Sequence, residues 1–261
     1  MAKKSKQKAI ADVESRIIDV KESSAFVRVL LYGDNGHGKT RLAATGPKSI
    51  IIDCNEQGTQ SIRNYPDTKV FPAASWEDIV FAYWYLKQGK HDRETVIVDT
   101  LTMAQVMCIR AVLKQQADRD PNRPPNMPDK RTWGQVGEMM TEQILNFRNL
   151  PMNVVFVAQK KKEYNEDEED SEVYYVPDLT PKGRGAVTAA VGIIGYVYQG
   201  KVKVVDKKKK TTREKYVTKM LVGPHENYKT KDRTGLLGRT VIRPTMQQII
   251  EANNEAGPEE E

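Results

Sequence analysis

The stretch that decides the fold lies near the start of the chain and reads Gly33-Asp34-Asn35-Gly36-His37-Gly38-Lys39-Thr40. Glycines at this spacing let consecutive backbone N–H groups turn inward around phosphate oxygens, where side chains would obstruct the approach. The lysine ammonium suits the β- and γ-phosphates of a nucleotide, and the threonine hydroxyl suits Mg²⁺. The segment therefore predicts a phosphate-binding loop.

The sequence on either side of this loop supports the prediction. Residues 27–32 form a strongly apolar strand that leads into the loop, and Arg41 opens a helix-forming run that continues to residue 44. A helix that begins at the loop adds its N-terminal dipole to the phosphate site. We therefore expect ATP and Mg²⁺ as cofactors, with residues 33–40 and Arg41 as the nucleotide contacts.

Apolar runs and helical patterns alternate along the rest of the chain. Strands are predicted over residues 27–32, 49–53, 95–99 and 153–158, and helices over 75–88, 101–117 and 132–149. This alternation is typical of an α/β fold with a mainly parallel central sheet and helices on both faces. Alternating apolar residues over 194–198 and 215–222 predict a C-terminal hairpin that extends the sheet antiparallel.

Polar side chains at strand ends belong to the sheet edge where ligands bind in open α/β folds. Asp99 ends a buried run and is the expected acid of the Mg²⁺ shell, with a turn or cap residue as the alternative. Glu56 is the expected group that activates water, and Asp53 is the competing candidate. Gln159 is placed to sense the γ-phosphate and to pass that information into the segment that follows.

Two polar segments interrupt the pattern, and two more close the chain. Residues 120–128 are rich in proline and predict an exposed loop. Residues 160–184 begin with three lysines, contain an acidic run and predict a second long loop. Neither terminus carries enough apolar surface to order itself, so we expect a basic flexible tail over 1–24, one domain over 25–250 and an acidic tail over 251–261.

Length and composition set outer bounds on the function. A chain of 261 residues suits one α/β domain, and its net charge of +6 suits a polyanionic partner without requiring one. The two cysteines, Cys54 and Cys108, lie inside apolar runs, so neither a disulfide framework nor a zinc site is indicated. No secretory signal or bilayer-spanning run is evident, and a cytoplasmic protein without a membrane partner is expected.

With the glycine loop, Glu56, Asp99 and Gln159 in this order, the chain resembles the RecA-like P-loop ATPase core. It resembles more closely the phage-encoded, core-only RecA-like proteins of the Sak-type single-strand annealing group. Residues 56–59, 133–134, 150–156 and 231–235 also carry the resemblance, which spans about residues 25–250. It implies ATP hydrolysis, with Lys39 at the phosphates, Glu56 polarising the attacking water and Gln159 as the switch.

The resemblance also implies partners. In RecA-like proteins the segment after the switch glutamine contacts single-stranded DNA, and the implied contacts here are Lys160, Lys161, Lys162, Lys182 and Arg184. Lys231 and Arg233 resemble a basic pair that a neighbouring subunit inserts into the ATP site, with a solvated basic turn as the alternative. That role implies self-association as a ring or filament. A single-strand-binding protein is a further implied partner, and a phage-encoded member acts in the host cytoplasm.

Two functions of other classes remain open beside a DNA-dependent ATPase of recombination or annealing. One is a nucleotide-regulated loader or assembly factor, whose basic loops grip an acidic protein surface instead of DNA. The other is a small-molecule kinase, which transfers the γ-phosphoryl group to a metabolite. The sequence offers no evident arginine-rich lid, so the kinase ranks last.

Overall fold

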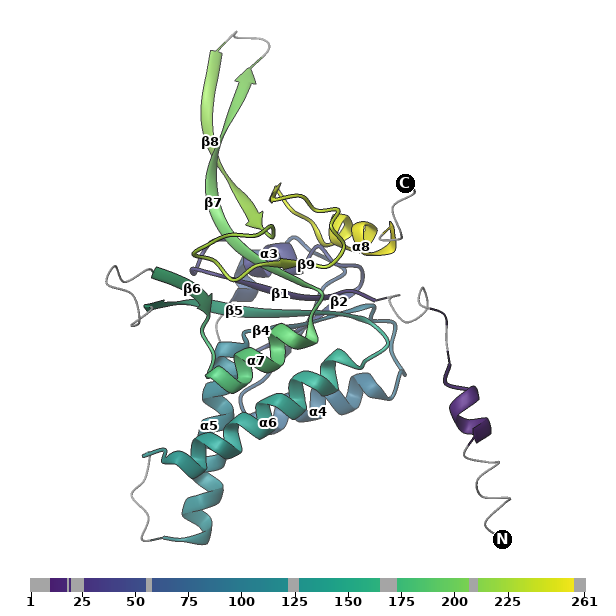
Figure 1. The fold of residues 1–261 in the computed structure, drawn as a ribbon, viewed down its shortest axis with the longest axis vertical. Helices are drawn as coiled ribbons and strands as arrows, with labels where there is room; N and C mark the ends of the chain where they lie inside the picture. The colour runs from purple at the N-terminus through teal and green to yellow at the C-terminus, as the bar shows by residue number, and fades with distance from the viewer. Residues whose placement is uncertain are drawn as a thin grey trace.

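The structure is a computed structural model and describes residues 10–17, 19, 26–54, 58–121, 127–164, 173–206 and 211–255. The strands within these ranges are Arg28–Gly33 (β1), Ser49–Asp53 (β2), Lys69–Pro72 (β3), Thr95–Asp99 (β4), Asn153–Tyr164 (β5), Val173–Pro177 (β6), Ile193–Asp206 (β7), Thr211–Leu221 (β8), Lys231–Asp232 (β9) and Thr240–Ile242 (β10). They join in one sheet, which forms the centre of the molecule (Figure 1).

The sheet has a parallel centre and an antiparallel side. Its main path runs β10-β8-β7-β1-β5-β4-β2-β3, while β6 pairs with β5 and β9 pairs with β7. Every pair from β7 through β1, β5, β4 and β2 to β3 is parallel, whereas β8 and β10 are added antiparallel. The predicted α/β fold with an antiparallel C-terminal extension is therefore confirmed. The carboxyl ends of the parallel strands meet at one edge.

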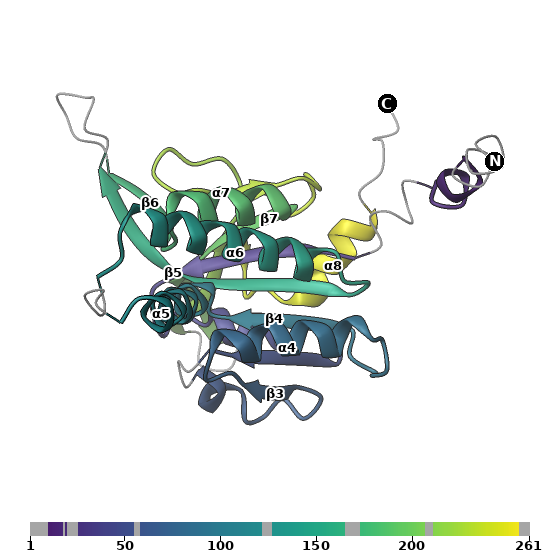
Figure 2. The ribbon, with the colours of Figure 1, turned by 90° about the horizontal axis from the view of Figure 1, so that it is seen from below.

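Helices cover both faces of the sheet, as the alternation predicts (Figure 1), and Figure 2 shows the face that α4, α5, α6 and α7 cover. They are Lys39–Ala43 (α3), Trp76–Lys87 (α4), Leu101–Arg119 (α5), Lys130–Arg148 (α6), Pro181–Ala190 (α7) and Met246–Glu255 (α8), with a 3-10 helix at Gly58–Ile62 (η1). Leu30 and Tyr32 of β1 face the core under α4, α5, α6 and α7. Val29 and Leu31 face the opposite core, under α3, η1 and α8.

Helices α4, α5, α6 and α7 each begin after a residue whose side chain accepts from one of their first free N–H groups. Ser75 starts α4 with a capping box, since its hydroxyl accepts from Asp78 N and the Asp78 carboxylate accepts from the backbone N–H of Ser75. Ser75 is thus the N-cap of α4. The face of α4 toward the core buries Trp76, Ile79, Tyr83 and Leu86, and Val80 beside them is only partly covered.

Several boundaries differ from the sequence prediction. Within the expected loop over 160–184, the described residues instead form the outer part of β5, the strand β6 and the start of α7, and residues 165–172, which carry the acidic run, lie outside the described residues. The outer part of β5, residues 160–164, extends beyond the main sheet and is polar on both faces, so no apolar alternation marks it, whereas β6 reads Val-Tyr-Tyr-Val-Pro. Helix α8 continues to Glu255, beyond the expected boundary at residue 250, because Ala252 is buried beside Ile249. Residues 10–14, inside the expected basic tail, form a short helix.

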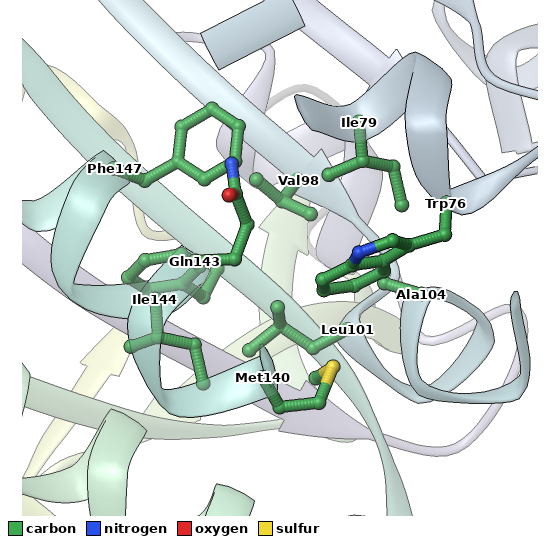
Figure 3. Close-up of a pocket in the computed structure, with 10 residues that line it drawn as sticks. Trp76, Ile79, Val98, Leu101, Ala104, Met140, Gln143, Ile144 and Phe147 are labelled. Atoms are coloured by element: carbon green, nitrogen blue, oxygen red, sulfur yellow. The ribbon is translucent and has the colours of Figure 1, made fainter. Parts of the chain in front are cut away.

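No helix in the described part of the chain has both the length and the apolar character that crossing a membrane requires. A small cavity of about 10 Å³ lies in the core between α4, α5, α6 and β4, lined by Trp76, Leu101 and Phe147 among others. Figure 3 shows these apolar side chains around the amide of Gln143. The space is at the lower limit for one water, so it is a packing gap and not a ligand site.

Gln143 should be a destabilising residue in this core. Its side-chain Nε2 is buried and has no hydrogen-bond partner among the described residues. Replacing Gln143 with methionine, which has a similar volume, should raise the free energy of unfolding by about 1 kcal/mol, because an unpaired buried amide is removed. Chemical denaturation measures the change. The same replacement at the exposed Gln247 of α8 should stay within about 0.5 kcal/mol, and a destabilised Gln143→Met would contradict the assignment.

Candidate nucleotide-binding site

The glycine loop connects the carboxyl end of β1 to α3, and two of its glycines are required by close approach. A Cβ atom at Gly33 would lie 2.2 Å from the carbonyl oxygen of Val197 in the neighbouring strand β7. Gly38, the N-cap of α3, has φ of 94°, in the left-handed region that favours glycine. A Cβ there would lie 2.9 Å from Thr218 Oγ1 of β8. The loop is therefore seated against the β7–β8 pair.

Lys39 lies at the centre of the loop and is almost fully buried. Its Nζ donates to the carbonyl oxygens of Gly33 and Asp34, both at 2.9 Å, and to Gln159 Oε1 at 3.1 Å. These contacts hold the ammonium over the concave side of the loop. The structure thus brings together Lys39 and Gln159, as the sequence predicts.

Thr40 and Asp99 form the second group at this edge. The Thr40 hydroxyl donates to Asp99 Oδ2 at 2.6 Å, and Asp99 is buried at the end of β4 beside Asp53 of β2. A Cβ at Gly58 would lie 3.1 Å from Thr40 Oγ1 and 3.4 Å from Asp99 Oδ2, so glycine leaves room beside both oxygens. One hydroxyl and one carboxylate, with space for waters and phosphate oxygens, fit Mg²⁺.

These residues line one open cleft of about 560 Å³. Its wall includes loop residues from Asn35 to Arg41, the start of η1, and both Asp99 and Gln159. No cluster of three or more His, Cys, Asp or Glu residues suited to a metal was found in the described ranges. That result agrees with Mg²⁺, which takes one or two carboxylates and completes its shell with phosphate oxygens and water.

Gln159 links the cleft to the hairpin of β5 and β6. Its backbone N–H donates to Thr102 Oγ1 at 3.0 Å, and its carbonyl oxygen accepts from the N–H of Asp178 at 2.8 Å. The next residue, Lys160, places its ammonium 2.7 Å from Asp34 Oδ2 of the glycine loop and 4.7 Å from the ring centroid of Tyr175 in β6. The hairpin is therefore attached to the loop at two adjacent residues.

Of the two candidates for water activation, the structure describes Asp53 but not Glu56. Glu56 lies outside the described residues, in the gap between Cys54 and Gly58. Asp53 ends β2, in register with Asp99, and its carbonyl oxygen accepts from the N–H of Ala73. The described residues on either side of this gap are Cys54, whose N–H donates to the carbonyl oxygen of Asp99, and Gly58, which lines the cleft.

The basic residues expected to contact DNA differ in their exposure and in the carboxylates that lie beside them. Lys161 and Lys162 are exposed on the outer part of β5, and the ammonium of Lys161 lies 3.5 Å from Glu163 Oε1. Lys182 pairs with Glu138 of α6, and Lys160 with Asp34. Arg184 forms a bidentate pair with Glu163, in which both nitrogen–oxygen distances are 2.7 Å. This pair lowers the pKa of the Glu163 carboxyl. Four of the five cations are thus paired with carboxylates of their own chain.

Lys231 and Arg233 lie at the opposite edge of the sheet from the glycine loop. Strand β9 pairs with the start of β7, where Lys231 lies opposite Ile194. The ammonium of Lys231 donates to the carbonyl oxygens of Thr188 and Val191, at 2.9 Å and 2.6 Å, at the C-terminal end of α7. Burial, with Arg233 and Lys229 nearby, lowers the pKa of Lys231. Arg233 is exposed. Neither residue lines the cleft of its own chain.

Two further features of the site have no recognisable signal in the sequence. Gln199 of β7 donates from Nε2 to the carbonyl oxygen of His37 at 3.2 Å and to Thr218 Oγ1 at 3.1 Å, which holds the loop against β7 and β8. A second cleft, of about 390 Å³, meets the first at Gly38 and Arg41, and Tyr65, Tyr216 and Arg243 are among its walls. Only the strand pairing reveals these contacts, because their residues lie far apart in the sequence.

Comparison with known proteins agrees with this geometry. A family model described as an AAA domain matches residues 25–234, which is most of the chain. A sequence search of curated proteins gives no match. The matched range contains the glycine loop, Asp99 and Gln159, so the family and the cleft point to the same chemistry. The chain belongs to the AAA domain family and is a P-loop ATPase.

Proposed function

We propose that this ATPase is a RecA-like protein that acts on single-stranded DNA in recombination or annealing. The observation that carries the proposal is the position of Gln159, whose side chain touches Lys39 while its backbone begins the projecting β5–β6 hairpin. A phosphate that takes up the Lys39 ammonium competes directly with the Gln159 amide. Nucleotide binding at the loop and the conformation of the hairpin are therefore coupled through one residue.

Residues on each side of the cleft have separate tasks in ATP hydrolysis. Lys39 and the loop N–H groups hold the phosphates, and Thr40 and Asp99 would hold Mg²⁺, which supplies positive charge against the phosphate oxygens when bound. The second cleft adjoins the loop at Gly38 and Arg41, away from Asp99 and Gln159. Its aromatic and guanidinium groups suit the nucleobase and ribose, so we assign the base to that side.

Glu56 should be the group that orients the attacking water. The Glu56→Gln variant should lose turnover by about 10²–10⁴-fold, because general base catalysis is removed, while ATP binding is retained. The Asp53→Asn variant should lose far less. Phosphate release and equilibrium binding of a fluorescent ATP analogue separate the two quantities. The reverse ranking of the two variants would assign the role to Asp53.

The arm formed by the outer parts of β7 and β8, residues 198–206 and 211–219, is a second candidate surface for DNA. Figure 1 shows this arm projecting well beyond the helices that cover the sheet. Lys203, Arg213 and Lys215 are exposed on it, and no ion pair to them occurs among the described residues. Lys201 pairs with Glu214. Unpaired cations on a projecting hairpin suit a phosphate backbone better than the paired cations around α7 do.

DNA binding at the arm predicts a defined loss of salt dependence. Replacing Lys203, Arg213 and Lys215 with glutamine should reduce the slope of log affinity for single-stranded DNA against log salt by about 2, since each lost phosphate contact removes about 0.7. Turnover without DNA should be unchanged. Fluorescence anisotropy at several salt concentrations measures the slope. Replacing the exposed Lys69, Lys114 and Lys130 with glutamine gives a control of equal charge.

The same measurements distinguish a DNA-dependent ATPase from a loader that binds a protein partner. Wild-type turnover should rise when single-stranded DNA is added. If the wild type binds no DNA at low salt and DNA does not stimulate it, the proposal of a DNA-dependent ATPase is wrong. ATP-dependent binding of an acidic protein partner would then favour the loader. If the wild type binds DNA and the triple variant keeps the full slope, DNA binds elsewhere, with Lys161 and Lys162 as the next candidates.

A further inference from the structure

The second cleft beside the glycine loop offers a base both aromatic rings and polar side chains. The rings belong to Tyr65, which follows η1, and to Tyr216 of β8. Stacking on a ring is open to every base, because every base has a π-face. The choice between adenine and guanine therefore depends on the hydrogen-bonding side chains of the cleft.

Several of these side chains already have partners in the protein. Thr45 Oγ1 donates to a carbonyl oxygen of α3 and accepts from the N–H of the first residue of α8. Thr245 Oγ1 accepts from another N–H of α8. Gln199 Nε2 donates to the carbonyl oxygen of His37 and to Thr218 Oγ1, so its amide presents an acceptor oxygen to the cleft and no further strong donor. These groups hold the walls of the cleft together.

Two arginines make the cleft rich in hydrogen-bond donors. Within the described ranges, the guanidinium groups of Arg41 and Arg243 have no hydrogen bond or ion pair, and no Asp or Glu lines the cleft. A guanidinium donates and never accepts. Guanine presents two acceptors, O6 and N7, on one edge, whereas adenine has an amino donor in place of O6. The cleft is thus more complementary to the guanine edge than to the adenine edge.

Arg243 is the arginine placed to contact the base. Arg41 lines both clefts and so adjoins the phosphates, whereas Arg243 lines only the second cleft. The φ of Arg243 is 53°, in the left-handed region that is uncommon for a long side chain, and its N–H donates to the carbonyl oxygen of Thr218 at 2.9 Å. Thr218 also lies beside Gly38 of the loop. The turn that carries Arg243 is therefore fixed beside the loop, with the backbone strain that is typical of functional sites.

We propose that Arg243 donates to O6 and N7 of guanine, so that the protein binds and hydrolyses GTP as well as ATP. The inference rests on the base assignment made under the proposed function and not on DNA. Hydrolysis itself is unchanged. Water adds to the γ-phosphorus, the bond from this phosphorus to the bridging oxygen breaks, and GDP, inorganic phosphate and a proton are released. The residues that hold the phosphates serve both nucleotides, so the difference lies in the affinity for the base.

Competition against a fluorescent ATP analogue, with Mg²⁺ and without DNA, tests the proposal. GTP should bind the wild type at least as tightly as ATP. Inosine triphosphate keeps O6 and N7 and should bind like GTP, whereas 7-deaza-GTP lacks N7 and should bind about 10-fold more weakly than GTP. In Arg243→Gln the ratio of GTP affinity to ATP affinity should fall by about 10–100-fold, because an amide pairs with N6 and N7 of adenine. The kcat/KM values should follow the same ratio.

Two further variants control for charge and for position. Arg243→Lys keeps the charge without the planar fork and should also lose the preference for GTP. Arg239→Gln changes an exposed arginine outside the cleft and should keep the wild-type ratio. Circular dichroism checks that each variant is folded.

Three results would overturn the proposal. The first is a wild type that binds GTP much more weakly than ATP. The second is an equal loss of ATP and GTP affinity in Arg243→Gln, which would place Arg243 at the phosphates or the ribose. The third is an unchanged affinity for every nucleotide in both Arg243→Gln and Tyr65→Leu, which would show that the base assignment itself is wrong. Turnover is measured separately, so a failed ATPase is distinguished from a failed choice of base.

Discussion

Replacing Lys39 with alanine should reduce ATP turnover by about 10²–10³-fold and leave the fold intact. The ammonium is almost fully buried, and its present partners are two backbone carbonyl oxygens and the Gln159 amide. These oxygens remain accessible to water from the cleft when the side chain is removed, so the cost to stability should be small. The phosphates, however, lose a charge that acts in a partly desolvated site. Turnover and affinity for an ATP analogue should therefore fall together.

Lys69→Ala is the matched control for this variant, because Lys69 is an exposed lysine on the edge strand β3. It should turn over ATP at the wild-type rate. Thermal unfolding of Lys39→Ala, followed by circular dichroism, should give a single transition close to that of the wild type. If Lys39→Ala turns over ATP at the wild-type rate, the cleft is not the ATP site. If Lys39→Ala does not fold, the affinity is measured with the milder variant Lys39→Met.

Replacing Asp99 with asparagine should weaken Mg²⁺ binding to the nucleotide complex by about 10–100-fold. Asparagine keeps the size of the side chain and an oxygen that accepts from the Thr40 hydroxyl, so only the negative charge is lost. Mg²⁺ is a hard cation that prefers charged oxygen ligands. Turnover at limiting Mg²⁺ should fall accordingly, and higher Mg²⁺ should restore part of it. A Mg²⁺ titration of the initial rate measures the shift.

The Asp92→Asn variant controls for the loss of one carboxylate, since Asp92 is an exposed residue paired with Arg93 at the surface. Its Mg²⁺ titration should coincide with that of the wild type. An unchanged titration for Asp99→Asn would show that the buried carboxylate serves only to orient Thr40. Gly58 offers an independent check: Gly58→Ala would bring a Cβ atom beside both oxygens and should shift the titration in the same direction.

The centre of the fold was predictable because its elements are local and strongly patterned. The strands β2 and β4 have the bounds that their apolar runs predict, and α4, α5 and α6 begin within two residues of theirs. Parallel strands buried on both faces read as continuous apolar runs, and Ser75 marks a helix start by its capping chemistry. Lys39, Thr40, Asp99 and Gln159 converge because consecutive parallel strands share one carboxyl edge.

The parts that could not be predicted depend on contacts between distant residues. The outer part of β5 is polar because it leaves the main sheet, and its pairing with β6, not its composition, makes it a strand. Gly58 has a role only because η1 returns beside Thr40 and Asp99. The positions of Lys231 and Arg233 follow from the pairing of β9 with the far end of β7. The outer face of α4 looks like core in the sequence, and only burial separates it from the inner face.

The hydrogen bond from Gln199 to the carbonyl oxygen of His37 connects the arm directly to the phosphate-binding loop. Thr218, on the opposite strand of the arm, lies beside Gly38, so close that a Cβ atom at this glycine would lie 2.9 Å from Thr218 Oγ1. A displacement of the arm, for example by a bound ligand, is therefore transmitted to the loop. If nucleotide binding changes the affinity of the arm for its ligand by a given factor, thermodynamic reciprocity requires that the ligand changes the affinity of the loop for the nucleotide by the same factor.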